Sequence, residues 1–149
     1  MLEIRPYQKG DFIHMRNISF DPFALFGPDA ELTFSGLRTI WDGDTRVCVA
    51  GFAAFMPGVV GSFAAVDRVA AKGQARALVD RLRCLIGMWA PANNVHRVEA
   101  TCSSTDRTAQ VFLRAIGFRF ESVVEAGAPD GTDLHQFKII FRRNENELS

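Results

Sequence analysis

The clearest hydrophobic pattern in the chain predicts a helix near its middle. Apolar residues recur at i, i+3, i+4, i+7, i+10, i+11 and i+14, starting from position 75, whereas charged residues occupy the opposite side. Pro91 and the asparagine pair that follows it are expected to end this helix. The apolar positions are Ala75, Leu78, Val79, Leu82, Leu85, Ile86 and Trp89.

Short apolar or alternating runs on both sides of this helix predict strands. Turn signals separate them, notably Asp42-Gly43-Asp44, Pro57-Gly58 and the segment 128–133. The predicted strands cover residues 2–5, 37–41, 46–55, 59–66, 97–102, 118–125 and 134–141.

Further helices are predicted from capping residues. Gly10-Asp11 offers a start for a helix that continues through Met15, and Pro28-Asp29 offers a second start. The segment 103–105 is expected to cap a later helix that ends at Gly117. The apolar face of this later helix consists of Ala109, Phe112, Leu113 and Ile116.

The segment 20–36 is rich in aromatic residues and is interrupted by Pro22 and Pro28. Its phenylalanines suit either the core of the domain or a surface that contacts a partner, and irregular spacing favours the core.

The order of these elements, β-α-α-β-β-β-α-β-α-β-β, predicts an α/β (α+β) fold. A strand-helix-strand unit in the middle implies a parallel pair of strands, and the flanking strands imply antiparallel neighbours. We therefore expect a mixed, mostly antiparallel sheet with a central parallel pair and helices on both faces. The length of 149 residues favours a single domain over residues 1–141, followed by a polar tail at 142–149.

Composition narrows the choice of partners and compartment. Lys plus Arg and Asp plus Glu both number 17, so no overall charge favours nucleic acid. No window is apolar enough to span a bilayer and the first residues do not resemble a secretory signal, so we expect a soluble, cytoplasmic protein. Three scattered cysteines and three scattered histidines predict free thiols and no metal site.

Two segments resemble the acyl-CoA N-acyltransferase (GNAT) superfamily, whose element order is similar. Residues 66–78, which read VDRVAAKGQARAL, are similar to the strand, loop and helix that carry a Q/R-x-x-G-x-G/A motif in that family. Within residues 98–118, Asp106-x-x-Ala109 and the ending Ala-Ile-Gly-Phe118 are similar to its N-x-x-A and L-G-F helix. The resemblance implies an acetyl-CoA-dependent acetyltransferase that acts on an amine.

The resemblance also implies a cofactor site at the start of the central helix. Main-chain amides at a helix N-terminus bind pyrophosphate, and small residues allow the close approach. The resemblance further implies that the pantetheine arm lies between residues 62–66 and 98–102, and that an amide near Val66 polarises the thioester carbonyl. The residues expected to hold the cofactor are Val66, Lys72, Gly73, Gln74, Ala75, Arg76, Ala77 and Asp106.

Several positions depart from the family pattern. Ala70 stands where Gln or Arg is expected, and Asp106 stands where Asn is expected. Leu113 occupies the position at which many relatives have a tyrosine that protonates the departing thiolate, and the only tyrosine in the chain is Tyr7. The usual general acid is therefore missing.

Asp67 and Glu99 are the candidates for the base that accepts a proton from the amine. Each lies at or near a predicted strand end, and each also suits a capping or surface role, which is the commoner outcome for such carboxylates.

A narrower resemblance opens a second reading. Short motifs along the chain are similar to GNAT-related proteins of short-tailed bacteriophages, among them internal virion proteins. This reading implies a non-catalytic virion or assembly protein that contacts other virion proteins and needs no intact cofactor motif. The motifs are Pro57-Gly58, Gly61, Arg81-Leu-Arg83, His96-Arg97, Ala100, Phe112-Leu113, Gly117-Phe118 and Asp130-Gly131-x-Asp133.

Overall fold

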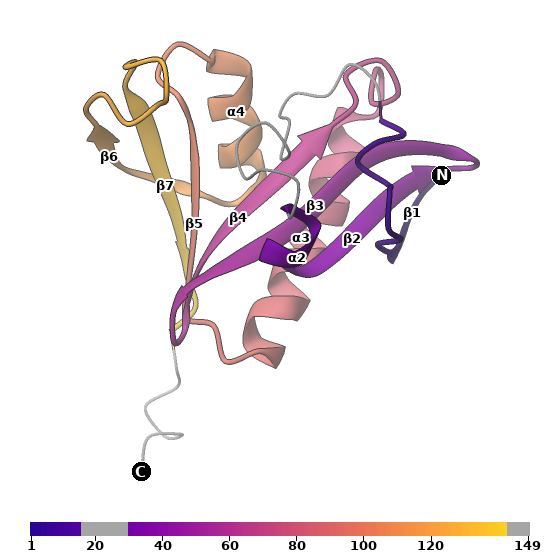
Figure 1. The fold of residues 1–149 in the computed structure, drawn as a ribbon, viewed down its shortest axis with the longest axis horizontal. Helices are drawn as coiled ribbons and strands as arrows, with labels where there is room; N and C mark the ends of the chain where they lie inside the picture. Colours follow the sequence, from indigo (N-terminus) through magenta and orange to yellow (C-terminus); the bar gives the residue numbers. More distant parts are fainter. Residues whose placement is uncertain (16–29, 143–149) are drawn as a thin grey trace. The chain divides into compact units, whose positions relative to one another are not determined.

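The computed structural model describes residues 1–15 and 30–142, which contain seven strands and three helices (Figure 1). In chain order these elements are β1 Leu2–Pro6, α2 Ala30–Thr33, β2 Ser35–Asp42, β3 Thr45–Met56, β4 Val59–Val66, α3 Ala75–Ala92, β5 Arg97–Ser103, α4 Arg107–Ile116, β6 Arg119–Val124 and β7 Leu134–Ile140.

The strands form one sheet in the order β1-β2-β3-β4-β5-β7-β6. The pairs β1·β2, β2·β3, β5·β7 and β6·β7 are antiparallel, whereas β4 and β5 are parallel and are connected through α3. The prediction of a mixed, mostly antiparallel sheet with a central parallel pair is confirmed.

The parallel pair is short compared with the strands that form it. Its register joins Val59 to Arg97, Val60 to Val98 and Gly61 to Glu99. Beyond these partners β4 continues to Val66 and β5 continues to Ser103, where β5 still pairs with β7. The two parallel strands are thus partners over their first residues only.

The chain divides into two compact units. Unit 1 comprises Met1–Ala54 and Ser62–Leu82, and unit 2 comprises Phe55–Gly61 and Arg83–Ser149. β4 and α3 each pass from one unit into the other. A single domain over residues 1–141 stays a prediction, and the predicted tail lies, apart from Arg142, outside the described residues.

Unit 1 has a core in which aromatic rings pack on the first half of the sheet. The ring centroids of Phe12 and Tyr7 are 5.2 Å apart, those of Phe12 and Phe63 are 5.9 Å apart, and those of Phe34 and Phe63 are 4.3 Å apart. Gly51 is required beneath this cluster, because a Cβ there would lie 2.7 Å from a Leu37 methyl group. Phe34 is half-buried against the Phe63 ring, whereas positions 20–29 lie outside the described residues.

The predicted helix after Gly10 is wrong over its described part. Hydrogen-bonded turns occupy the residues up to Met15 instead. Asp11 does not cap a following turn of helix, because its buried carboxylate accepts hydrogen bonds from the Gln8 N–H at 2.9 Å, the Thr39 hydroxyl at 2.5 Å and Arg46 Nε at 2.9 Å. These long-range partners outcompete the local cap.

Unit 2 packs α4 against β5 and β6, as the apolar face of this helix predicts. Phe137 of β7 is fully buried, with the Phe120 ring 5.9 Å away edge-on and the Arg114 guanidinium 5.9 Å above it. The predicted C-terminal Gly117 is confirmed at φ 121°, a conformation that favours glycine. The predicted cap at 103–105 is wrong by one residue, because Asp106 caps the helix.

Candidate functional site

The loop between β4 and α3 is organised by Asp67, which directly follows β4. Its side chain is 8% exposed, and its Oδ1 accepts hydrogen bonds from the N–H groups of Val69 and Ala70, both at 3.0 Å. Its main-chain oxygen accepts from the Ala71 N–H at 2.9 Å. Asp67 therefore holds a turn, and this role accounts for the residue without any catalysis.

Two of the six predicted cofactor amides are already used inside this loop. The Lys72 N–H donates to the Val69 carbonyl at 3.3 Å, and the Gln74 N–H donates to the Ala71 carbonyl at 2.9 Å. Lys72 and Gln74 therefore donate their main-chain N–H groups to a turn in this structure, and cofactor binding by these two residues stays a prediction.

The other four amides have no hydrogen-bond partner among residues 1–15 and 30–142. They belong to Gly73, Ala75, Arg76 and Ala77, all exposed. Three of them fall in the first turn of α3, whose N–H groups cannot bond within the helix. These four donors and the positive end of the helix dipole form what we call the α3 amide site.

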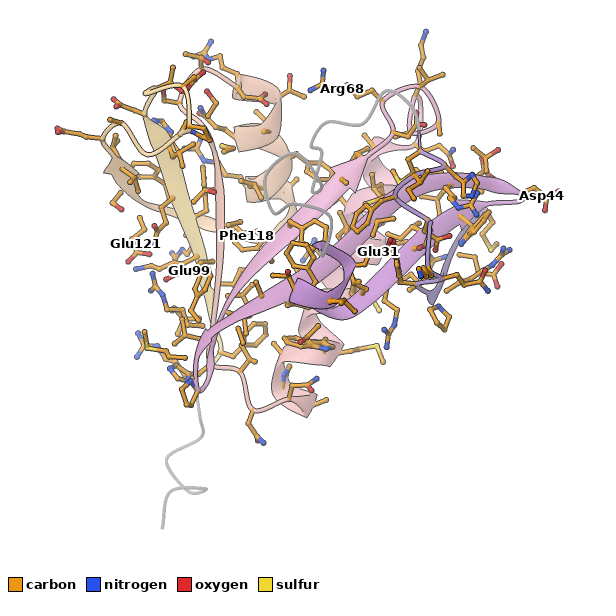
Figure 2. The ribbon with its side chains drawn as sticks, viewed as in Figure 1. Glu31, Asp44, Arg68, Glu99, Phe118 and Glu121 are labelled. Atoms are coloured by element: carbon orange, nitrogen blue, oxygen red, sulfur yellow. The ribbon has the colours of Figure 1, made fainter. Side chains whose placement is uncertain are left out.

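Gly73 is required for its backbone conformation, and a side chain at this position would not clash with a neighbour. Its φ is +77°, and an added Cβ would meet nothing within 4 Å. Exposed cations lie close to the α3 amide site in the sequence: Arg76 belongs to it, Lys72 directly precedes it, and Arg68 lies on the preceding loop and is labelled in Figure 2. The charge and the open backbone suit an anionic ligand such as a diphosphate.

Glu99, the second candidate base, lies in an ion-pair cluster on β5 and β6. The Arg97 guanidinium donates to Glu99 Oε1 at 2.7 Å and to the Glu121 carboxylate, and Figure 2 shows the two glutamates side by side. Both hydrogen bonds raise the pKa of Arg97, and the bond from Arg97 holds the pKa of Glu121 below its ordinary value. A carboxylate that already accepts from a guanidinium is poorly suited to accept a proton from an amine.

Asp106 caps α4, with its Oδ1 accepting from the Ala109 N–H at 3.0 Å. An aspartate serves this purpose as well as the family asparagine does. Leu113 is half-buried on the same helix, and Val66 is half-buried at the last position of β4. Tyr7 lies in unit 1, where burial and a hydrogen bond with Glu31 raise its pKa, so its hydroxyl stays protonated.

The cysteines differ in exposure, and the described residues contain no metal-binding group. Cys48 is buried, Cys84 is exposed and Cys102 is half-buried. Within the described parts of the chain, no three His, Cys, Asp or Glu side chains meet as a metal site would require. None of the helices described is both long and apolar enough to cross a bilayer.

Sequence reasoning missed one residue near the α3 amide site. Asp42, at the end of β2, accepts a hydrogen bond from the Gln74 side chain at 3.0 Å. The two residues are 32 positions apart. Asp42 was interpreted only as part of a turn, and no local pattern links it to the loop.

Several solved acetyltransferase structures are similar to this chain. The chain is similar to the ribosomal-protein-S18-alanine N-acetyltransferase of Escherichia coli, with 16% identity, 98% of each chain covered and a TM-score of 0.72. A Bacillus subtilis acetyltransferase in complex with CoA matches with 13% identity, 95% and 98% coverage of the two chains and a TM-score of 0.72. A GNAT-family acetyltransferase of Streptococcus pneumoniae matches with 15% identity, 95% and 100% coverage and a TM-score of 0.70.

The sequence itself matches no protein-family model and no curated protein. At 13–16% identity these structural similarities concern the fold alone. The similarity extends over 95–98% of this chain and 98–100% of those structures. The chain therefore has the fold of the GNAT acetyltransferases.

Proposed function

We propose that the protein binds acetyl-CoA and transfers its acetyl group to an amine. The observation that carries the proposal is the α3 amide site, in which four main-chain N–H groups without a partner in the described part of the chain lie at the positive end of an 18-residue helix. Donors of this kind suit the diphosphate of CoA. Fold relatives that include a CoA complex support the same ligand.

Main-chain amides and charged side chains have different roles in the proposed binding. The amides of Gly73, Ala75, Arg76 and Ala77 donate to diphosphate oxygens, and the side chains of Lys72 and Arg76 add positive charge. Acetyl-CoA supplies an activated thioester when it is bound. A main-chain N–H near Val66, which is the last residue of β4, is the candidate for polarising the carbonyl of that thioester.

Proton transfer does not depend on a dedicated side chain in this proposal. Asp67 holds a turn, Glu99 is paired with Arg97, and Leu113 has no proton to give. The amine then arrives unprotonated, and water or the amine itself delivers a proton to the departing thiolate. The rate of transfer should accordingly rise with pH until the amine is fully unprotonated.

Calorimetric titration with acetyl-CoA tests the proposal, and S-acetylpantetheine serves as the matched ligand without diphosphate and nucleotide. We expect acetyl-CoA to bind and S-acetylpantetheine to bind much more weakly, because only the former reaches the α3 amide site. Absence of acetyl-CoA binding by the folded protein, or equal affinity for the two ligands, contradicts the proposal.

A second candidate function is a non-catalytic role as a bacteriophage virion or assembly protein. The observation that favours it is that both candidate bases are occupied in structural roles and that Leu113 replaces the usual acid. Its proposed contact surface, residues 20–34, lies mostly outside the described residues. A folded protein that binds no acetyl-CoA but associates with other virion chains supports this alternative.

A further inference from the structure

Gln74 joins the loop after β4 to the end of β2. Its side-chain nitrogen donates to Asp42 Oδ2 at 3.0 Å and to the Ala70 carbonyl at 3.2 Å. An amide nitrogen carries two hydrogens, so both donors of the Gln74 side chain are satisfied.

The main chain of Gln74 is also bonded in both directions. Its N–H donates to the Ala71 carbonyl at 2.9 Å, and its own carbonyl accepts from the Leu78 N–H at 2.9 Å, which is the first hydrogen bond of α3. Gln74 is thus the residue before the helix, and it lies between Gly73 and Ala75, whose amides belong to the α3 amide site. Any movement of Gln74 moves these two donors.

Asp42 provides a fixed partner for this residue. It is the last residue of β2 and is paired with Leu2 on one side and with Thr45 on the other. The second carboxylate oxygen of Asp42 lies 3.6 Å from the N-terminal amine of Met1, whose side chain is 90% exposed. An ion pair this exposed contributes little, so the hydrogen bond to Gln74 is the main contact that the carboxylate makes.

We infer that Asp42 and Gln74 are positioning residues that hold the α3 amide site in the conformation that binds the diphosphate of CoA. This inference rests on the proposed function. Gly73 beside Gln74 has wide backbone freedom, so a loop without this link spends part of its time with the four donors dispersed. Affinity falls in proportion to the fraction of molecules whose site is formed.

Two substitutions at position 42 isolate the hydrogen bond from the charge. Asp42→Ala and Asp42→Asn both remove the carboxylate charge, but the Asn side-chain oxygen still accepts from Gln74. Loss of one such bond predicts CoA binding roughly 3- to 10-fold weaker in Asp42→Ala than in Asp42→Asn, measured by calorimetry. Asp44→Ala is the matched control, since Asp44 lies at the tip of the same turn in Figure 2 and carries the same charge.

The affinity for S-acetylpantetheine separates a local effect from a general loss of structure, because a general loss of structure would lower this affinity as well. We expect its affinity to be the same in the wild type and in all three variants, because it does not reach the α3 amide site. Equal CoA affinity in Asp42→Ala and Asp42→Asn overturns the inference while the proposed function stands. If the wild type itself binds no CoA, the proposed function fails and the inference fails with it.

Discussion

The α3 amide site can be tested by removing a single main-chain donor. Ala75 is the first residue of α3, and this is the helical position at which proline is best accepted. Its N–H has no partner among the residues described, so Ala75→Pro breaks no internal hydrogen bond. Gln74, the preceding residue, occupies the cap position, where extended backbone angles are usual and compatible with a following proline.

The expected effect follows from the loss of one charge-assisted hydrogen bond. Such bonds are worth about 1.5–3 kcal/mol, so Ala75→Pro should weaken CoA binding roughly 10- to 150-fold. Thermal unfolding should change little, because the substituted amide contributes nothing to the helix. The side chain at this position is exposed, so burial adds no further cost.

Calorimetric titration of the wild type and two variants with CoA completes the test. Ala75→Val adds a side chain of similar size but keeps the N–H, so it reports any steric effect of the proline ring. We expect Ala75→Val to bind much more tightly than Ala75→Pro. If Ala75→Pro binds CoA as tightly as Ala75→Val does, the amide of this residue does not hold the ligand and the reasoning is refuted.

Three other outcomes follow from contacts described above. Asp67→Ala should lower the free energy of unfolding by about 1–3 kcal/mol, whereas Asp67→Asn should lower it less; loss of turnover in Asp67→Asn without loss of stability would mark Asp67 as the base. Cys84 should react rapidly with a disulfide reagent, whereas Cys48 should react only after unfolding, because burial raises its pKa to about 12. Arg97→Met should remove the stabilisation of Glu121, because the bond from Arg97 lowers the pKa of that carboxyl from its ordinary value of 4.5. This stabilisation is fully present above the ordinary pKa and is lost as the pH falls through the lowered pKa, so the free energies of unfolding of wild type and variant, measured in urea, should differ at neutral pH and converge at pH values below 4.5.

Local patterns predicted most of the fold because each element carries its own periodicity. The apolar repeat from Ala75 onward correctly places α3, and the turn at 42–44 correctly separates β2 from β3. Pro91 with Asn93-Asn94 was expected to close α3, and the helix ends at Ala92. Pro91 is accommodated inside the last turn, since a proline removes only its own N–H and the Asn93 N–H still bonds the Trp89 carbonyl at 3.1 Å. One lost bond in a last turn does not unwind the residues around it.

The candidate site was less predictable because its parts meet only after folding. The motif at Gly73 pointed to the loop in which four amides have no partner among the described residues, yet nothing local indicated that the Lys72 and Gln74 amides donate inside the loop. Asp67 and Glu99 looked alike in sequence. Their roles became distinct only when Asp67 was seen to hold a turn and Glu99 to face Arg97.

A binding surface made of main-chain donors places few demands on side-chain identity. The α3 amide site needs one left-handed glycine, small neighbours and a helix that begins in the right place. Many sequences meet those conditions, so such a surface can be kept while the surrounding sequence changes until little similarity is left. For proteins of this architecture, pairwise identity is consequently a poor guide to whether nucleotide recognition has been retained.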